Sequence, residues 1–188
     1  MNQTIDIQTE FTPNPNSLKF NLSRELIQKG SFFFDTKQSA KEVSDLATRL
    51  FEIPRVESIL IGQNFVTISR DPSLSSWGSL IEPVSKMIRE YVSSGAPIIN
   101  LQAASRLKKE PASDIEKKII QVLDTYVRPA IARDGGDITF HGFKDGVVTL
   151  HLQGACTTCP SSVATLKAGV ERMLCEFVPE VKEVVQVN

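Results

Sequence analysis

The stretch DITFHGFKDGVVTLHLQGACTTCPSS, residues 137–162, places a strand pattern, a turn and a pair of cysteines in direct succession. Apolar and polar residues alternate on either side of residues 144–146, which predicts a β-hairpin that turns at Lys-Asp-Gly. One face of its second strand carries Val148, Leu150 and Leu152, and the other carries Thr149 and His151. Pro160 directly follows the second cysteine and suits the first turn of a helix. The cysteines are therefore expected where a strand ends and a helix begins.

Helical patterns flank this hairpin on both sides. Before it, apolar residues recur at helical spacing at Ile115, Ile119, Val122, Leu123, Tyr126 and Ala130. Pro129 is expected to bend that helix near its end, and Gly135–Gly136 to stop it. After the cysteines, a buried helical stripe is expected at Val163, Leu166, Val170, Met173, Leu174 and Phe177. With residues 181–188 as a closing strand, residues 114–188 are predicted to form a domain of order α-β-β-α-β.

The N-terminal half predicts another small domain, residues 1–94, which contains several strands. Residues 56–71 hold two runs rich in β-forming residues on either side of Gln63 and Asn64, which indicates a hairpin. The segments SLKFNL, residues 17–22, and SFFFDT, residues 31–36, are typical of further strands.

Two amphipathic helices are expected beside these strands. The first covers residues 39–53, with Ser39 as its N-cap and Glu42 completing a capping box. The second carries an apolar stripe of Trp77, Leu80, Ile81, Val84, Ile88 and Tyr91. Residues 95–113 show no sustained period, hold two prolines, and are interpreted as a linker. The chain is thus predicted to be α+β, with two small mixed domains joined by a linker.

Composition excludes several classes of protein. The chain has 188 residues, of which 41% are hydrophobic and 23% charged, and its apolar runs fall far short of the ~20 residues that cross a bilayer. The net charge is −1 and no dense basic stripe is present, so neither a membrane nor a nucleic acid is expected as a partner. The first residues, MNQTIDIQTEF, match neither a secretory signal nor a transit peptide, which favours a bacterial cytoplasmic location or an already processed chain.

The Cys-x-x-Cys pair, Cys156 and Cys159, is the candidate site. In a reducing compartment such a pair binds metal or performs redox chemistry more often than it forms a structural disulfide. The amides and partial positive charge of a helix N-terminus favour a thiolate, and thiolates are the ligands of zinc and of iron–sulfur clusters. These sites take four ligands, whereas one pair supplies two.

Other side chains of the same chain do not complete this ligand set. Cys175 follows Cys159 by sixteen residues on the same predicted helix, roughly 24 Å away at ~1.5 Å per residue, and is expected to be a surface thiol that points away from the core. His141 and His151 are expected to be solvated surface residues. Ligation by four sulfurs would therefore need a second chain, with the bound group on the symmetry axis of a dimer.

Two other functions also fit the cysteine pair. A dithiol–disulfide oxidoreductase would need only one chain, and a zinc-bridged interaction module would use the same dimer. The sequence shows no Ser/His/Asp set, phosphate-cradling loop or paired carboxylates that would indicate hydrolytic or phosphoryl-transfer chemistry. On the residues alone these three alternatives stay open.

Several motifs resemble a known family. The segment 128–174, with an RP…DGGD helix exit, a GxCxxCPSS turn and a following helix that contains TLK, resembles the C-terminal domain shared by NifU and Nfu proteins. Residues 4–94 resemble the N-terminal domain of Nfu proteins through TPNPNSLKF, the hairpin VESILIGQNFVTIS and Trp77.

This resemblance implies a non-enzymatic iron–sulfur cluster scaffold or carrier. It implies that Cys156 and Cys159 are the ligands of a [4Fe-4S] cluster shared between two chains, so that a homodimer forms on cluster binding. It also implies transfer of the cluster to apo acceptor proteins of the lipoyl synthase or aconitase type, and upstream cluster-assembly proteins as donors. The N-terminal domain is expected to regulate the carrier or to recognise partners.

Overall fold

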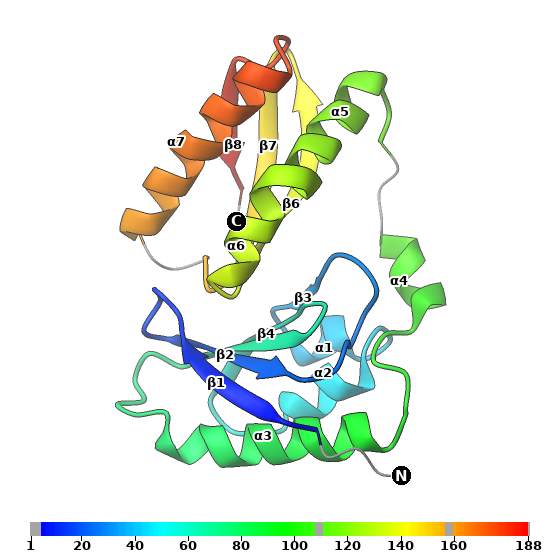
Figure 1. The fold of residues 1–188 in the computed structure, drawn as a ribbon, viewed down its shortest axis with the longest axis vertical. Coiled ribbons are helices and arrows are strands. Elements are labelled where there is room, and N and C mark those ends of the chain that lie inside the picture. The colour runs from blue at the N-terminus through cyan, green and yellow to red at the C-terminus, as the bar shows by residue number, and fades with distance from the viewer. Residues whose placement is uncertain (1–4, 108–110, 157–159, 188) are drawn as a thin grey trace. The chain divides into compact units, whose positions relative to one another are not determined.

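The structure is a computed structural model that describes residues 5–107, 111–156 and 160–187. The chain divides into two compact units, Met1–Lys108 and Lys109–Asn188. Figure 1 labels the helices and strands of both units. Helices and strands occur in each unit, so the predicted α+β class is confirmed.

The first unit is built on a five-stranded antiparallel sheet with the order β1-β2-β5-β4-β3. Its strands are β1 Ile7–Phe11, β2 Ser17–Leu22, β3 Phe32–Phe34, β4 Val56–Ile61 and β5 Phe65–Arg70. The strands predicted at 17–22 and 31–36 and the hairpin predicted within 56–71 are confirmed. The edge strand β1 was not predicted, because four of its five residues are exposed and give no apolar alternation.

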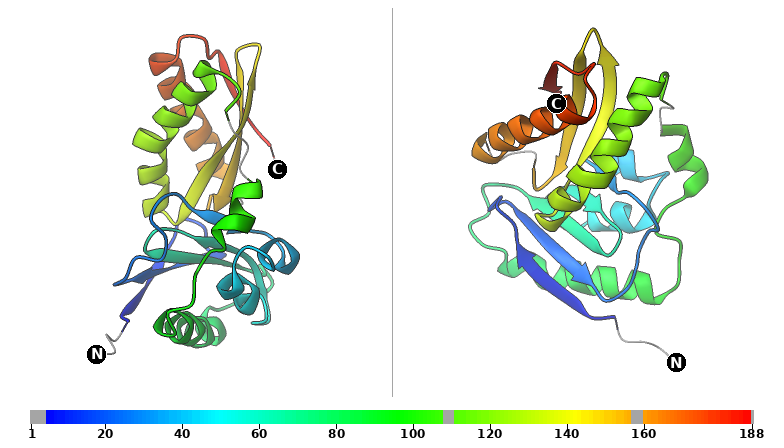
Figure 2. Two further views of the ribbon diagram at one scale, coloured as in Figure 1. Left: turned by 90° about the vertical axis from the view of Figure 1, so that its right-hand side faces the viewer. Right: turned by 45° about the horizontal axis from the view of Figure 1, so that its top comes forward.

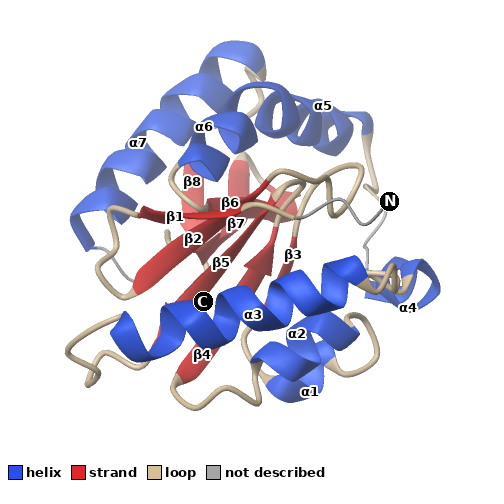
Figure 3. Ribbon diagram, turned by 60° about the horizontal axis from the view of Figure 1, so that its bottom comes forward, coloured by secondary structure: helices blue, strands red, loops and turns tan. Residues whose placement is uncertain are grey.

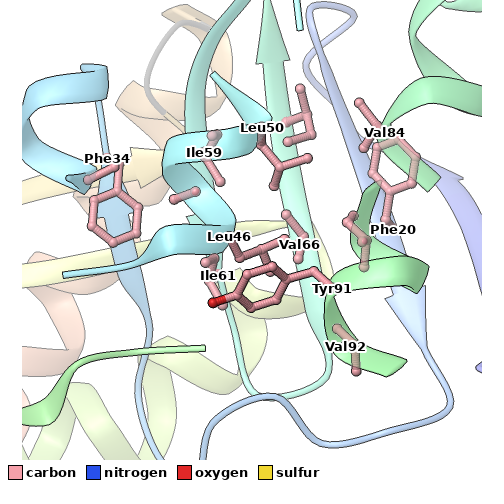
Figure 4. Close-up of a cluster of buried hydrophobic side chains, with 14 of the residues drawn as sticks. Phe20, Phe34, Leu46, Leu50, Ile59, Ile61, Val66, Val84, Tyr91 and Val92 are labelled. Carbon is pink, nitrogen blue, oxygen red and sulfur yellow. The ribbon is translucent and has the colours of Figure 1, made fainter. Parts of the chain in front are cut away.

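Helices cover one face of this sheet. They are α1 Lys37–Ala40, α2 Asp45–Leu50 and α3 Gly78–Ser93, and Figure 3 shows α3 running across the strands. The helix predicted after Trp77 is confirmed. Figure 4 shows Leu46 and Leu50 of α2 packed with Val84 and Tyr91 of α3 and with side chains of the strands.

The single helix predicted over residues 39–53 is wrong. Thr36, not Ser39, is the N-cap of α1, and its hydroxyl accepts a hydrogen bond from the Ser39 amide at 3.1 Å. The chain then leaves the helical conformation at Ser44, whose hydroxyl accepts from the Ala47 amide at 3.2 Å and donates to the Ile98 carbonyl at 2.7 Å. A serine side chain that binds backbone groups in this way favours a cap over a helix interior, so two short helices form.

The stretch 95–113, expected to be a linker, is partly packed against the first unit. Helix α4, Leu101–Leu107, lies within it, and Ile99 and Ala104 are buried in the core of the first unit. No helical period marks this helix, because among its residues 101–105 only Ala104 is buried. The domain limits 1–94, 95–113 and 114–188 stay predictions.

The second unit has the predicted order α-β-β-α-β. A helical segment comes first, made of α5 Asp114–Val122, the π-helical turn η1 Leu123–Val127 and α6 Arg128–Arg133. Then follow β6 Gly136–Lys144, β7 Val147–Gly154, α7 Pro160–Phe177 and β8 Glu183–Gln186. The sheet order is β6-β7-β8, with β6 and β7 antiparallel and β8 parallel to β7. Figure 2, left, shows the helices of this unit on one side of the β6–β7 hairpin.

The π-helical turn changes which residues of the first helical segment are buried. Tyr126 and Ala130 were expected in the core, but Tyr126 is 49% exposed, and Val127 and Ile131 are buried instead. A π turn contains one more residue than an α turn, so every later residue moves on by one position. Pro129 is the second residue after the turn and has no N–H for an α-helical bond to the carbonyl four residues earlier, which gives the turn a physical reason.

Candidate functional site

The two glycines that end the first helical segment lie beside the end of β7. Gly135 follows α6 with φ 76°, a left-handed conformation that suits glycine at a helix end. Gly136 then begins β6 and pairs with Gly154, the last residue of β7. The Ala155 amide donates to the Gly135 carbonyl at 3.2 Å. The residue before Cys156 is therefore fixed to the helix exit by a backbone hydrogen bond.

Cys156 comes directly after this anchored residue. It is half-buried, is not in a disulfide, and packs against the core of the second unit. Its Sγ lies so close to Gly136 that a Cβ built there would be 2.4 Å from the sulfur. Cys159 lies outside the described residues. The expected position of Cys156, just past the end of the hairpin, is confirmed.

Helix α7 begins at Pro160, so the expected helix start directly after the cysteine pair is also confirmed. The first amides of a helix have no intrahelical acceptor and carry a partial positive charge. Such a helix end favours the thiolate form of nearby cysteines.

An arginine between two aspartates connects the helical segment to β6. Arg128 Nε lies 3.1 Å from Asp124 Oδ1, and Arg128 Nη1 lies 3.7 Å from Asp137 Oδ2. Asp137 is buried. The i, i+4 spacing of Asp124 and Arg128 was a readable signal, but the contact with Asp137 depends on how helix and strand meet.

The remaining candidates lie apart from the cysteine turn. His141 is exposed as expected, while His151 is half-buried, with Nδ1 3.5 Å from Gln153 Nε2.

Cys175, in the last turn of α7, was expected to point away from the core. This prediction is wrong, because Cys175 is half-buried and packs against the core of the second unit. Phe177, expected in the buried stripe, is 48% exposed and stacks on Tyr126 with ring centroids 5.0 Å apart. Within residues 5–107, 111–156 and 160–187, no group of three or more His, Cys, Asp or Glu side chains is placed to hold a metal ion.

Comparison with known proteins covers both units. The family "NifU-like domain" matches residues 119–185, and "Scaffold protein Nfu/NifU N terminal" matches residues 7–95. The human protein named "NFU1 iron-sulfur cluster scaffold homolog, mitochondrial" is 39% identical over 182 residues, which is 96% of this chain and 71% of the human protein. The chain belongs to the Nfu/NifU family of iron–sulfur cluster scaffolds.

A second named protein agrees with this assignment. The protein of the same name from Drosophila willistoni is 39% identical over 188 residues. The aligned region covers 98% of this chain and 64% of that relative. A solution NMR structure of a NifU-like protein from Saccharomyces cerevisiae is 28% identical, over 52% of this chain and 86% of that chain, with a TM-score of 0.46. That structural similarity is too low to bear on the fold.

Family membership settles the general class. Nfu scaffolds are not enzymes, in agreement with the expectation from sequence. In the part of the chain that the structure describes, no helix has the length and apolar character needed to cross a membrane. The human and Drosophila willistoni relatives are mitochondrial by name, so the expected bacterial cytoplasmic location stays a prediction.

Proposed function

We propose that this chain carries a [4Fe-4S] cluster, bound between two copies of the chain through Cys156 and Cys159, and delivers it to apo-proteins. The observation that supports this most directly is the position of Cys156. It follows an anchored backbone turn, rests against Gly136 and is followed by the start of a helix, in a chain that belongs to a family of cluster scaffolds.

The chemistry of the donor set fits an iron–sulfur cluster. Cysteine thiolates are the usual ligands of such clusters, and a [4Fe-4S] cluster takes four of them. The chain has three cysteines, of which Cys175 lies in the last turn of α7, at the opposite end of the helix from Pro160. A helix of this length separates the two ends by roughly 25 Å at ~1.5 Å per residue. Two chains, each supplying the Cys-x-x-Cys pair, complete the set.

A cluster held in this way suits delivery. Its ligands are divided between two chains, so cysteines of an acceptor can replace them one after another. The acceptors proposed are apo iron–sulfur proteins of the lipoyl synthase or aconitase type, loaded from upstream assembly proteins. The first unit has a core of its own and is proposed to recognise these partners or to regulate delivery.

The test is anaerobic reconstitution with ferrous iron and sulfide of the wild type, the double variant Cys156→Ser/Cys159→Ser and the control Cys175→Ser. We expect about two irons and two sulfides per chain, which is one four-iron cluster per dimer, in the wild type and the control. The double variant should stay folded, monomeric and colourless. Transfer is then measured as activity gained by an apo-aconitase mixed with the loaded dimer.

Each competing function predicts a different result. A wild-type monomer that takes up no cluster but cycles between dithiol and disulfide would indicate an oxidoreductase. A colourless dimer that contains zinc would indicate an interaction module. Either result, or normal cluster uptake by the double variant, contradicts the proposal.

A further inference from the structure

The structure leaves no room for a side chain at Gly136. An ideal Cβ placed on it would lie 2.4 Å from Cys156 Sγ, and 3.1 Å from both the Gln153 carbonyl oxygen and Ile131 Cγ2. Non-bonded heavy atoms normally approach to about 3.5–4.0 Å. Even the smallest side chain would therefore overlap the sulfur.

The restriction comes from space and not from the backbone. Gly136 is not among the residues with positive φ, in contrast to Gly135. It pairs with Gly154 in the antiparallel ladder, and its own φ lies outside the positive region that alanine avoids. The lack of a side chain at Gly136 therefore leaves room for the Cys156 sulfur.

The atoms around that sulfur form a seat with three components. The Gly136 backbone lies beneath it, and the neighbouring Ile131 side chain and Gln153 carbonyl border the same space. Ile131 is buried, and Asp137, the residue after Gly136, is also buried and paired with Arg128. Ile131 and Asp137, which lie on either side of Gly136, are therefore both held in the interior of the second unit.

We propose that Gly136 is a positioning residue for the cluster, because it allows the Cys156 thiolate to rest on strand β6 in the orientation that the metal requires. This inference rests on the proposed function. A methyl group at residue 136 would displace the sulfur by about 1 Å, whereas metal–ligand distances tolerate roughly 0.2 Å. Changes next to ligands typically lower metal affinity 10- to 100-fold, and a loss of that size is expected for Gly136→Ala.

The chain offers a matched control on the same strand. Gly142 also lies in β6, its φ is not positive, and a Cβ built there would meet nothing within 4 Å. Gly136→Ala and Gly142→Ala therefore each add one methyl group to strand β6. Only the methyl group of Gly136→Ala overlaps the Cys156 sulfur.

The experiment compares the wild type, Gly136→Ala and Gly142→Ala in the full chain. Cobalt(II) is titrated under anaerobic conditions and followed by its thiolate charge-transfer absorption, and iron and sulfide uptake are then measured in reconstitution. We expect Gly136→Ala to weaken cobalt binding 10- to 100-fold and to lower cluster uptake accordingly. Gly142→Ala should bind both as the wild type does.

A second measurement does not depend on any metal. Urea unfolding is monitored by amide hydrogen exchange of β6 and β7. Gly136→Ala should lower the unfolding midpoint more in a chain that keeps Cys156 than in a chain that carries Cys156→Ala, because the latter lacks the sulfur that the added methyl group overlaps. If Gly136→Ala alone does not fold, recovery of folding in Gly136→Ala/Cys156→Ala supports the seat, and failure to recover contradicts it.

The outcomes separate this inference from the function on which it rests. A wild type that takes up no cluster overturns the proposed function and the positioning role together. A wild type and a Gly136→Ala variant that take up cluster equally well overturn the positioning role alone. Equal losses in Gly136→Ala and Gly142→Ala would show a general effect on the strand, and would also overturn it.

Discussion

Arg128 in α6 forms an ion pair with Asp137 in β6, with Nη1 and Oδ2 3.7 Å apart. The Asp137 side chain is 8% exposed and the Arg128 side chain 26%. Asp137 follows Gly136 directly, so this pair holds the helix against the strand residue on which the Cys156 sulfur rests. The ion pair is therefore a structural support of the site.

Loss of the Asp137 charge should destabilise the second unit. In Asp137→Asn, Arg128 keeps Asp124 but loses its buried partner, and breaking a largely buried charged contact should cost about 1–3 kcal/mol. The measurement is amide hydrogen exchange of β6 and β7. The control is Asp114→Asn, which removes the exposed pair with Lys117 and should lower stability far less. Equal costs in the two variants would contradict the supporting role of Asp137.

The position of the π-helical turn can be tested with two neighbouring residues. Val127 is 4% exposed and Tyr126 49%. Val127→Ala should cost about 2 kcal/mol because it removes buried methyl groups. Tyr126→Ala should cost about 1 kcal/mol, the value of its stacking on Phe177. Hydrogen exchange of α5 and α6 gives both values, and the reverse order would indicate a regular α-helix through residues 123–127.

The cap of α2 gives a test in the first unit. The Ser44 side chain bonds to the Ala47 amide and the Ile98 carbonyl, so Ser44→Ala should cost about 1–2 kcal/mol. Glu42→Ala, at the residue expected from sequence to complete a capping box, should change stability by less than about 0.5 kcal/mol. Trp77 is the only tryptophan of the chain and is buried in this unit, so its fluorescence reports unfolding of the unit. A larger cost for Glu42→Ala would favour the single helix.

Acid should weaken the first unit through Asp71. Hydrogen bonds from the Ser73 hydroxyl and amide, and then from Arg55, lower the pKa of this carboxyl from 3.8 to about 2. A carboxyl with a depressed folded-state pKa contributes stability above its unfolded pKa and loses it as the pH falls through the folded value. The urea midpoint of the wild type, followed by Trp77 fluorescence, should therefore fall between pH 4 and pH 2 more steeply than that of Asp71→Asn. Identical slopes would show that Asp71 does not contribute.

The elements predicted correctly from sequence are those with a clear strand or helix pattern of apolar residues along their length. The β4–β5 hairpin consists of two runs rich in β-forming residues, the β6–β7 hairpin alternates apolar and polar residues, and α3 carries an apolar stripe. The junction of strand and helix at the cysteines followed from the hairpin and Pro160. Edge strand β1 and helix α4 bury too few apolar residues to produce a period.

Other features depend on tertiary contacts that no local pattern encodes. The break at Ser44 depends on the carbonyl of Ile98, far along the chain. The π-helical turn, in contrast, has a local reason in Pro129, but its shift by one residue departs from the regular helical period used for prediction. The contact of Gly136 with the Cys156 sulfur follows from strand register and from the entry of the chain into the cysteine turn. Sequence therefore placed Cys156 at the correct junction but did not show what lies beneath it. Cys159 and the cluster type stay predictions.

The hairpin of β6 and β7 also bears on the order of events during folding. Gly136 and Gly154 pair at its open end, so the strand backbone on which the Cys156 sulfur rests is in place once these two strands have joined. Hairpins close within about 1–10 μs, whereas β8 must pair parallel to β7 after the intervening α7 has packed. Because contacts between nearby residues form before distant ones, we expect the backbone beneath Cys156 to form early and the C-terminal strand β8 to dock late. During synthesis on the ribosome, the backbone beneath Cys156 would then be in place before β8 completes the domain.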